Sequence, residues 1–359
     1  MRIIAVETSC DETALAVLNF LSSEAGTRYE IEREIVASQI EAHRPYGGVV
    51  PHIARREHEK NLPIIFDNIL RTAFNAGAAE ADVVAVTVGP GLDPCLWSGI
   101  NFAKDIHKKH FPGAKLVGAN HLEGHLYSFL LSQEAGITNR KLRILNGKVF
   151  PAVQLLVSGG HTMLILMRSL SDWEILGQTR DDSVGETFDK VARMLGLPYP
   201  GGPEVEKLAR SIVSENGGNS RASCARLPSF PEPMMHSGDY DFSYSGLKTA
   251  VLYYLRDHPS ADKAAVARAF QEAAFAPLVH KAKKAAERHG AKSVMLSGGV
   301  AASRALREKV QKMCRGRYNF FTAPAEYNTD NAVMIALAAY INQLAGKKYK
   351  LGAQPDLSL

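Results

Sequence analysis

One order of secondary structure occurs twice along this chain, and that repetition limits the possible folds more than any other feature. Alternating apolar residues predict three strands near the N-terminus and three more in the second half of the chain. These strands lie at about 2–7, 13–19, 33–39, 151–157, 162–168 and 173–178. Helical and extended patterns alternate after each set, which indicates a duplicated α/β architecture. Two such domains would face each other across a cleft, the usual place for a ligand.

The remaining segments give the extent of the two predicted domains. Further strands are predicted at 82–88, 115–119, 293–297 and 318–322. Helices are predicted at about 52–76, 96–110, 121–132, 184–196, 203–215, 245–257, 261–289 and 330–344, with another from residue 301. We expect an N-terminal domain over 1–133, a polar linker over 134–149, and a C-terminal domain over 150–329 with a Gly/Ser/Pro-rich insertion at about 216–244. The last helix, at about 330–345, is expected to pack back onto the first domain.

The composition is that of a globular protein large enough for two domains. Of the 359 residues, 46% are hydrophobic and 22% are charged. The net charge of +5 permits an RNA partner without demanding one. Local lysine clusters, at 281–284 and at 347–350, are typical of solvated helix faces.

Cysteine usage and the N-terminus indicate a cytoplasmic protein. The four cysteines lie far apart without a C-x-x-C pair, which argues against a zinc finger and against a disulfide framework. The chain starts with a strand and not with a signal or transit peptide, and no stretch approaches 18 uninterrupted apolar residues. We therefore expect buried thiols in a reducing compartment.

Two histidines with helical spacing are the strongest candidates for a metal site. In His121-Leu-Glu-Gly-His125 the imidazoles are four residues apart on a predicted helix, so they lie on one face. This geometry suits two ligands of a single metal, and imidazole binds Zn, Fe or Ni. Asp330, which opens the last predicted helix, is either an N-cap or a third ligand.

The tripeptide Ser-Gly-Gly occurs twice, each time after a predicted strand. Ser158-Gly159-Gly160 lies between two strands, so it is either a hairpin turn or a loop whose backbone N–H groups bind a phosphate. Ser297-Gly298-Gly299 lies between a strand and a helix, where the helix N-terminus favours anions. The presence of the same tripeptide in both halves of the repeated pattern favours a nucleotide held between the two domains. Neither copy matches the P-loop or Rossmann sequence, so a different nucleotide-binding fold is indicated.

Several polar residues near these turns are candidates for substrate contacts. Asp11 and Glu12 follow the first strand in Glu7-Thr-Ser-Cys-Asp-Glu-Thr13; they either form part of a hairpin turn or orient water, magnesium or phosphate. Asp189, on a predicted helix before Tyr199-Pro-Gly-Gly-Pro203, is a candidate partner for ribose hydroxyls. Surface or capping roles are expected for three further histidines, His43, His52 and His58.

Together these motifs resemble the universal tRNA N6-adenosine threonylcarbamoyltransferase family, formerly described as O-sialoglycoprotein endopeptidases. The resemblance runs from Glu7 to Ala332, nearly the whole chain, and the absence of a transit peptide favours a bacterial-type member. Besides the motifs above, it rests on Gly47-Gly-Val-Val-Pro51, Gly89-Pro-Gly-Leu92, Gly185-Glu-Thr-Phe-Asp-Lys190, Phe242-Ser-Tyr-Ser-Gly-Leu-Lys248 and Thr329-Asp-Asn-Ala332.

The resemblance implies a fold, a reaction and partners. The fold is that of actin, Hsp70 and sugar kinases (the ASKHA fold), with two domains facing across a nucleotide cleft. The reaction transfers threonylcarbamoyl from threonylcarbamoyl-AMP to N6 of adenosine 37, in tRNAs that read codons beginning with A. The implied partners are a paralogous actin-like subunit, a small ATPase and an upstream adenylate-forming enzyme. We expect the isolated chain to bind tRNA weakly and in a salt-sensitive way.

The resemblance also implies roles for individual residues. His121, His125 and Asp330 match the ligands of one divalent metal, Fe or Zn. The positions that match contacts to the adenylate are Leu156, Val157, Ser158, Gly159, Gly160, Asp189, Gly202 and Glu206. Asp11 and Glu12 are the candidate catalytic residues, and Mg²⁺ is a candidate companion of the AMP phosphate.

Three places depart from the family pattern. Ser303 stands where the family usually has Asn, and we include it among the nucleotide-binding candidates. His52 follows Pro51 in place of the common Glu, and Gly91-Leu-Asp-Pro-Cys-Leu-Trp97 is atypical after its Gly-Pro-Gly. The last two differences affect positions that could contact a partner or tRNA.

Three other functions fit parts of the sequence. A metallopeptidase uses a histidine pair with a glutamate, but H-E-x-x-H puts that glutamate directly after the first histidine, where this chain has Leu122. A non-catalytic, actin-like nucleotide-binding partner subunit is disfavoured by the presence of both histidines. A sugar or acetate kinase would share the fold, but no sugar-binding pattern is visible in the sequence.

Overall fold

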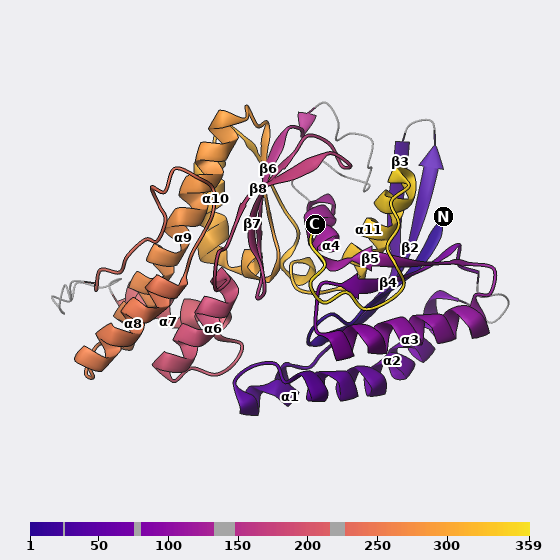
Figure 1. Cartoon of the computed structure of the whole chain (residues 1–359), viewed down its shortest axis with the longest axis horizontal. Helices are drawn as coiled ribbons and strands as arrows, with labels where there is room; N and C mark the ends of the chain where they lie inside the picture. The colour runs from indigo at the N-terminus through magenta and orange to yellow at the C-terminus, as the bar shows by residue number, and fades with distance from the viewer. Residues whose placement is uncertain (24–25, 75–79, 133–147, 216–226) are drawn as a thin grey trace. The chain divides into compact units, whose positions relative to one another are not determined.

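The computed structural model describes residues 1–23, 26–74, 80–132, 148–215 and 227–359 (Figure 1). These residues form two compact units, of which unit 1 comprises Met1–Lys148 and Thr322–Leu359, and unit 2 comprises Val149–Phe321. Most of the predicted linker and the first part of the predicted insertion lie outside the described residues. Each unit is built around one five-stranded sheet.

The sheet of unit 1 has the strand order β3-β2-β1-β4-β5. Its strands are β1 (Arg2–Glu7), β2 (Glu12–Ser23), β3 (Gly26–Ser38), β4 (Val83–Gly89) and β5 (Lys115–Asn120). The β1–β2 and β2–β3 pairs are antiparallel, whereas β1 pairs parallel with β4 and β4 pairs parallel with β5. The parallel pairs follow from the helices that cross over between those strands.

The sheet of unit 2 repeats this strand order. It runs β8-β7-β6-β9-β10, with β6 (Ala152–Val157), β7 (Thr162–Met167), β8 (Trp173–Gln178), β9 (Ser293–Ser297) and β10 (Asn319–Thr322). The first strand of the unit, β6, pairs antiparallel with β7 and parallel with β9, as β1 does with β2 and β4. The duplicated α/β architecture predicted from the sequence is confirmed.

Helices cover both faces of the unit 1 sheet (Figure 1). After the short α1 (Ile40–His43), α2 (Pro51–Ala73) and α3 (Asp93–His110) share one core with alternate strand residues such as Ile4 and Val6. On the other face, α11 (Ala332–Ala345) packs against β1, β2 and β5 and beside α4 (His121–Tyr127). Every residue of α4 is buried, so its seven positions are set by packing.

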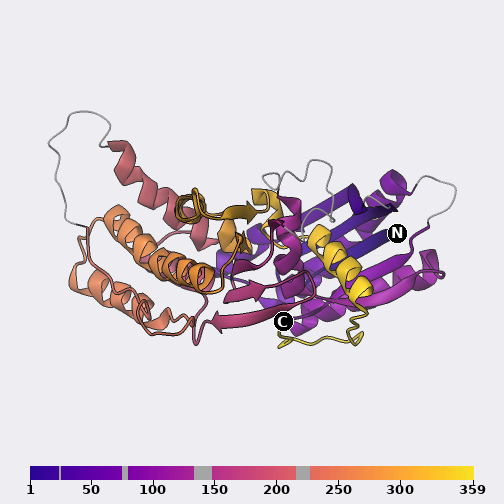
Figure 2. The same ribbon diagram turned by 90° about the horizontal axis from the view of Figure 1, so that it is seen from above.

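The helices of unit 2 bury a second core. They are α6 (Val184–Leu195), α7 (Gly201–Glu215), α8 (Ser245–Asp257), α9 (Lys263–Arg288) and α10 (Arg304–Cys314). The longest of them, α9, packs on β6 and β9 and also contacts α7, α8 and α10 (Figure 2). Its alanine-rich sequence places many small side chains in the core, which permits these close contacts.

The structure corrects three predicted boundaries. The predicted strand at 33–39 is longer, because β3 begins at Gly26; charged residues alternate along this edge strand and hide its apolar period. The predicted helix at 121–132 ends at Tyr127 and continues as the 3₁₀ turn Ser128–Leu131. The helix predicted from residue 301 starts at Arg304, after the 3₁₀ turn Gly299–Ala302.

Two of the lysines assigned to solvated helix faces are held by hydrogen bonds and ion pairs instead. Lys281 is 1% exposed, and its ammonium donates to Ser237 Oγ at 2.9 Å and to Asp239 Oδ1 at 3.3 Å. Lys347 donates to the buried Glu123 carboxylate. Lys281 is thus buried with its oxygen partners, whereas Lys347 stays exposed and only its ammonium reaches the buried carboxylate.

Two of the four cysteines are buried, as expected from the sequence. Cys95 and Cys314 are buried, and burial raises the pKa of both thiols to about 12. Cys10 is half-buried, and Cys224 lies outside the described residues. Within the described ranges, none of the helices is both long enough and apolar enough to span a bilayer.

The buried carboxyl of Glu34, on β3, makes the stability of unit 1 depend on pH. Burial raises the pKa of Glu34 to about 7, against the opposite effect of hydrogen bonds from the Val333 N–H and the Tyr327 hydroxyl. Because the folded protein binds this proton more tightly than the unfolded chain, stability falls as pH rises from about 4.5 to above 7. Between pH 5 and 8, the free energy of unfolding should fall by about 1–3 kcal/mol less in Glu34→Gln than in the unsubstituted chain.

Urea unfolding at a series of pH values measures this difference. The matched control is Glu30→Gln, on the same strand, where the side chain is 59% exposed. Equal pH slopes in Glu34→Gln and in the unsubstituted chain would show that Glu34 is not responsible.

Candidate functional site

The helix that carries the two histidines begins directly at the end of a strand. Asn120, the last residue of β5, caps α4 by accepting a hydrogen bond from the Leu122 N–H at 2.8 Å. Its amide also donates to the Ser358 carbonyl at 2.8 Å, so the C-terminal segment holds the cap in place. The imidazoles of His121 and His125 lie on one face of α4 in an edge-to-face arrangement, with ring centroids 4.7 Å apart.

Asp330 completes the cluster from a segment more than two hundred residues away. Its Oδ1 lies 3.5 Å from His121 Nε2 and 3.1 Å from His125 Nε2. The N-cap of α11 is Asn331, which accepts from the Met334 N–H, so Asp330 is not needed for capping. One ligand atom from each of the three residues lies within 4.8 Å of the others. Two imidazoles and one carboxylate fit one divalent cation with positions left for other ligands.

A second carboxylate orients the first histidine. Glu7 is fully buried, and its Oε2 lies 3.2 Å from His121 Nδ1 while accepting from the Thr87 hydroxyl at 2.6 Å. Ser9 Oγ lies 3.1 Å from the same ring nitrogen. Because Nδ1 is engaged on this side, His121 presents Nε2 to Asp330, which is the usual carboxylate–histidine arrangement around a metal.

The electrostatics of the cluster favour a cation. Burial alone would lower the pKa of His121, but the Asp330 and Glu7 carboxylates outweigh it and raise that pKa to about 9. Burial would likewise raise the pKa of Glu7, yet the neighbouring His121 lowers it overall. The site therefore attracts positive charge, and a divalent ion competes there with a proton.

Glu123, between the two histidines, points the other way. Its buried carboxylate accepts from the Asn342 amide at 2.6 Å and from the Lys347 ammonium at 2.5 Å. A Cβ on Gly124 would lie 2.9 Å from Met334 Cγ, so only glycine lets α4 pack this closely on α11. Glu123 thus fastens the helix and does not face the histidine cluster.

The turn after β1 lies against this cluster. Asp11 is buried and Glu12 half-buried, and burial followed by the charges of Asp330 and Asp11 holds the pKa of Glu12 well above its usual range. The structure therefore brings Glu12 into the electrostatic field of Asp330. It does not test a catalytic role for either acid.

The histidines near Gly47-Gly48 have structural roles, and two of them are not at the surface. His58 lies 2.8 Å from Thr13 Oγ1 through Nδ1 and 3.0 Å from the Cys10 carbonyl through Nε2. His43 is also buried, and Gln39 Oε1 lies 3.2 Å from its Nε2. His52 is exposed, as predicted. The buried pair holds the turn after β1 in place.

Both Ser-Gly-Gly turns lie in unit 2, which corrects the idea that one copy belongs to each half of the chain. They are neighbours because β6 and β9 are adjacent parallel strands, with Leu156 opposite Ser297. Gly298 has a φ of 88°, and a Cβ there would lie 2.4 Å from the Val157 carbonyl oxygen. The structure therefore explains this glycine by backbone packing.

The first of these turns has the hairpin geometry and also meets a helix N-terminus. The Ser158 N–H donates to the His161 carbonyl at 2.8 Å, which closes the β6–β7 hairpin. Gly159 and Gly160 are exposed, and nothing lies within 4 Å of a Cβ built on either. Ser183, the N-cap of α6, donates to the Gly159 carbonyl. Leu156 and Val157 are fully buried, so neither residue presents a surface to a ligand in this structure.

The other nucleotide candidates of unit 2 lie at helix N-termini or hydrogen-bond to them. Asp189 Oδ1 accepts from the Gly201 N–H at 2.7 Å, and a Cβ on Gly202 would meet nothing within 4 Å. Glu206 Oε1 accepts from the Ala305 N–H at 3.1 Å at the beginning of α10. Ser303 is the N-cap of α10, and its hydroxyl accepts from the Leu306 N–H at 3.3 Å. Glu206 and Ser303 thus meet at one helix N-terminus, which supplies a structural role for each.

Sequence reasoning missed the residues that support the histidines. Glu7 and Thr87 stand on buried strands, and Glu7 was noted only as the start of a motif, without its contact to His121. Asn342 and Lys347 lie far along the chain from Glu123, so only the tertiary structure pairs them. The sequence did offer one signal for these pairings: Glu123 is a charged residue in an otherwise buried helix, and a buried charge requires a partner.

Comparison with known proteins decides the family. Residues 30–337 match the family described as TsaD, tRNA N6-adenosine threonylcarbamoyltransferase. The chain belongs to this family. Proteins of that name align with it almost end to end in Moorella thermoacetica (43% identity, covering 100% of this chain and 97% of the relative), Thermosipho africanus (41%, 100% and 98%) and Bacillus licheniformis (39%, 100% and 97%).

Solved structures support the fold of this threonylcarbamoyltransferase family member. Full-length HypF in its phosphate- and nucleotide-bound form superposes with a TM-score of 0.58 at 13% identity, over 96% of this chain and 46% of HypF. HypF of T. kodakarensis gives the same score at 15% identity, over 96% and 48%. The chain spans about half the length of these proteins, and the likeness concerns the fold alone. It agrees with the duplicated ASKHA topology of the two sheets.

The double substitution His121→Ala/His125→Ala should remove bound metal from this family member. The chain would lose both imidazole donors, and a single carboxylate holds a transition metal weakly. Metal content of the purified protein, measured by inductively coupled plasma mass spectrometry, should fall from near one ion per chain to background. His52→Ala, at an exposed position, should retain the ion.

Circular dichroism shows whether the double variant is folded. Asp330→Asn, which removes one donor with little change in volume, provides a second test if it is not. Full metal occupancy in a folded His121→Ala/His125→Ala protein would contradict the assignment of the ligands.

Proposed function

We propose that this chain transfers the threonylcarbamoyl group from threonylcarbamoyl-AMP to N6 of adenosine 37, in tRNAs that read codons beginning with A. The observation that carries the proposal is the convergence of His121, His125 and Asp330 in a chain of the threonylcarbamoyltransferase family. Relatives that bear this name align with the chain along their whole length, which supports the same activity here.

In this proposal the three clustered residues hold one divalent ion, Fe or Zn. Such an ion, when bound, supplies a Lewis acid for oxygen atoms of the threonylcarbamoyl group. The chain's own contribution is to keep the ligands in place before substrate arrives: Glu7 fixes the tautomer of His121, and Glu123 fixes the helix. Preorganisation of this kind lowers the cost of orienting a weakly nucleophilic exocyclic amine.

Asp11 and Glu12 are our candidates for handling the proton that the adenosine amine releases. Both acids follow β1, whose last residue contacts His121. Burial, followed by the charges of Asp330 and Asp11, raises the pKa of Glu12, which makes its carboxylate a stronger proton acceptor.

The AMP moiety is assigned to unit 2. The exposed Gly159 and Gly160 offer backbone N–H groups, and the open space at Gly202 would let a ribose or base approach. Asp189, Glu206 and Ser303 are the candidate polar contacts, although each also accepts a structural hydrogen bond. Mg²⁺ is proposed as a companion of the phosphate.

The proposal includes partners and a compartment. A paralogous actin-like subunit, a small ATPase and an upstream adenylate-forming enzyme would work with this chain in the cytoplasm, where tRNA is used. These assignments come from the family and not from the geometry of the chain.

The rival functions gain no support. A metallopeptidase needs a glutamate that faces the metal-bound water, but Glu123 is committed to Asn342 and Lys347. A non-catalytic partner subunit would not need the histidine cluster. No relative or structural neighbour described above is a peptidase or a kinase by name.

The activity is tested by mass spectrometry of nucleosides. Unmodified tRNA is incubated with the chain, threonine, bicarbonate, ATP and the partner proteins, and then digested. We expect threonylcarbamoyladenosine with the unsubstituted chain and at most a hundredth as much with Asp330→Asn. Glu326→Gln, which removes an exposed carboxylate from the same segment, should form the product normally.

Omission of each component shows that the product depends on the chain. Product formed equally well without the chain, or with no effect of Asp330→Asn, would overturn the proposed role of the cluster.

A further inference from the structure

The positive charge of the chain is concentrated in one segment of unit 2. Residues 263–317 contain 13 Lys or Arg and 3 Asp or Glu, out of 42 and 37 in the whole chain. The other residues therefore carry 29 basic and 34 acidic side chains and are net acidic. The positive excess of the chain thus comes entirely from α9, α10 and the residues that follow them.

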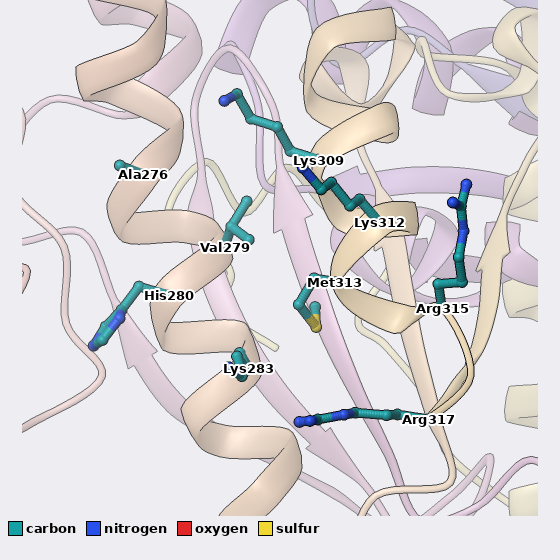
Figure 3. Close-up of a pocket in the computed structure, with 9 residues that line it drawn as sticks. All are labelled: Ala276, Val279, His280, Lys283, Lys309, Lys312, Met313, Arg315 and Arg317. Atoms are coloured by element: carbon teal, nitrogen blue, oxygen red, sulfur yellow. The ribbon is translucent and has the colours of Figure 1, made fainter.

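These two helices enclose a hollow of about 580 Å³ on the surface of unit 2 (Figure 3). Ala276 and Val279 from α9 and Met313 from α10 form an apolar, half-buried lining. The other side chains that line it are basic: His280, Lys283, Lys309, Lys312, Arg315 and Arg317. Lys309 and Lys312 extend from α10 towards α9, and Arg317 reaches across below Met313 towards Lys283 (Figure 3).

The carboxylates at this hollow are too few to neutralise it. Glu287 is shared by two cations, Lys283 at 3.9 Å and Arg317 at 3.6 Å. Glu272 is likewise shared, by Arg268 and Lys309. The Glu287 pairs are largely exposed, so each contributes little and exchanges easily with another anion. The Glu272 pairs are half-buried.

Lys312 and Arg315, at the end of α10, differ from these paired cations. Lys312 and Arg315 are both exposed, and no carboxylate in the described ranges lies within 4 Å of either. The excess charge is felt nearby: partial burial, followed by His236 and three neighbouring lysines, lowers the pKa of His280. Lys281 is not part of this surface, because it is buried against Asp239.

We propose that the basic hollow between α9 and α10 binds the sugar–phosphate backbone of the RNA substrate. The inference rests on the proposed function, which requires the chain to hold a tRNA. Exposed lysines and arginines spread around an open hollow suit a run of phosphodiesters, which needs many weak and adaptable contacts. A small anionic metabolite is typically held by a few buried, converging donors, and the cations here are exposed.

The test measures tRNA binding by the full chain carrying Lys312→Glu/Arg315→Glu. Fluorescence anisotropy with a labelled, unmodified tRNA transcript gives Kd at several salt concentrations. We expect Kd to rise at least tenfold at low salt, and the slope of log Kd against log salt to decrease by about 1 to 2, the value for two lost phosphate contacts. The charge-matched control is Lys108→Glu/Lys109→Glu, at exposed positions on α3, which should change Kd less than twofold.

Three results would overturn the inference. Unchanged affinity and salt slope in Lys312→Glu/Arg315→Glu would remove the hollow from the RNA surface. An equal loss in the Lys108→Glu/Lys109→Glu control would show only a general effect of net charge. Displacement of tRNA by tripolyphosphate at micromolar concentration would identify a discrete small-anion site instead.

The outcome is separable from that of the proposed function. Normal threonylcarbamoyladenosine formation with unchanged RNA affinity in the variant would contradict the inference alone. Loss of RNA affinity in the variant, with no modified nucleoside from the unsubstituted chain, would support the RNA surface and contradict the proposed reaction.

Discussion

The arrangement of unit 1 depends on one buried carboxylate, that of Glu123. A charge in this position is costly unless it is fully paired, and Asn342 and Lys347 supply the pairing. The same contact joins α4 to the C-terminal part of the chain, which also holds the Asn120 cap through Ser358. His121 and His125 are thereby fixed on the opposite side of α4, where Asp330 can reach them. The cluster is therefore a product of long-range packing around a short helix.

In unit 2, close backbone packing determines how the turns and helix N-termini are arranged. Its two Ser-Gly-Gly turns lie side by side because β6 and β9 are parallel neighbours, and glycine at 298 is required by contact with Val157. Gly185 plays the same part at the start of α6, where a Cβ would lie 2.5 Å from the Ser158 carbonyl oxygen. Exposed backbone and helix N-termini gather there as a consequence, which is the chemistry that phosphate binding needs.

The sequence was sufficient for the architecture and for placing His121 and His125 together, for identifiable reasons. Apolar periodicity reports burial, so the strands and helices were found in order, and the i, i+4 histidines require only a helix to meet. It was insufficient where function depends on distant pairing. Asp330 remained ambiguous until Asn331 proved to be the N-cap, and Lys347 resembled a surface lysine until its partner Glu123 was known. The two Ser-Gly-Gly turns were wrongly divided between the two halves, because the motif does not show that β6 and β9 are neighbours in one sheet.

The central claim is that Glu123 positions the two histidines, and zinc affinity tests it most directly. Competition with a chromophoric chelator gives the Zn²⁺ affinity of folded Glu123→Gln and Lys347→Met proteins, with exposed Lys348→Met as the matched control. We predict at least a tenfold loss of affinity in the first two variants, the scale found for residues that support metal ligands, and no change in the control. Unchanged Zn²⁺ affinity in both Glu123→Gln and Lys347→Met would contradict the claim, because the histidines would then be positioned without the Glu123–Lys347 ion pair.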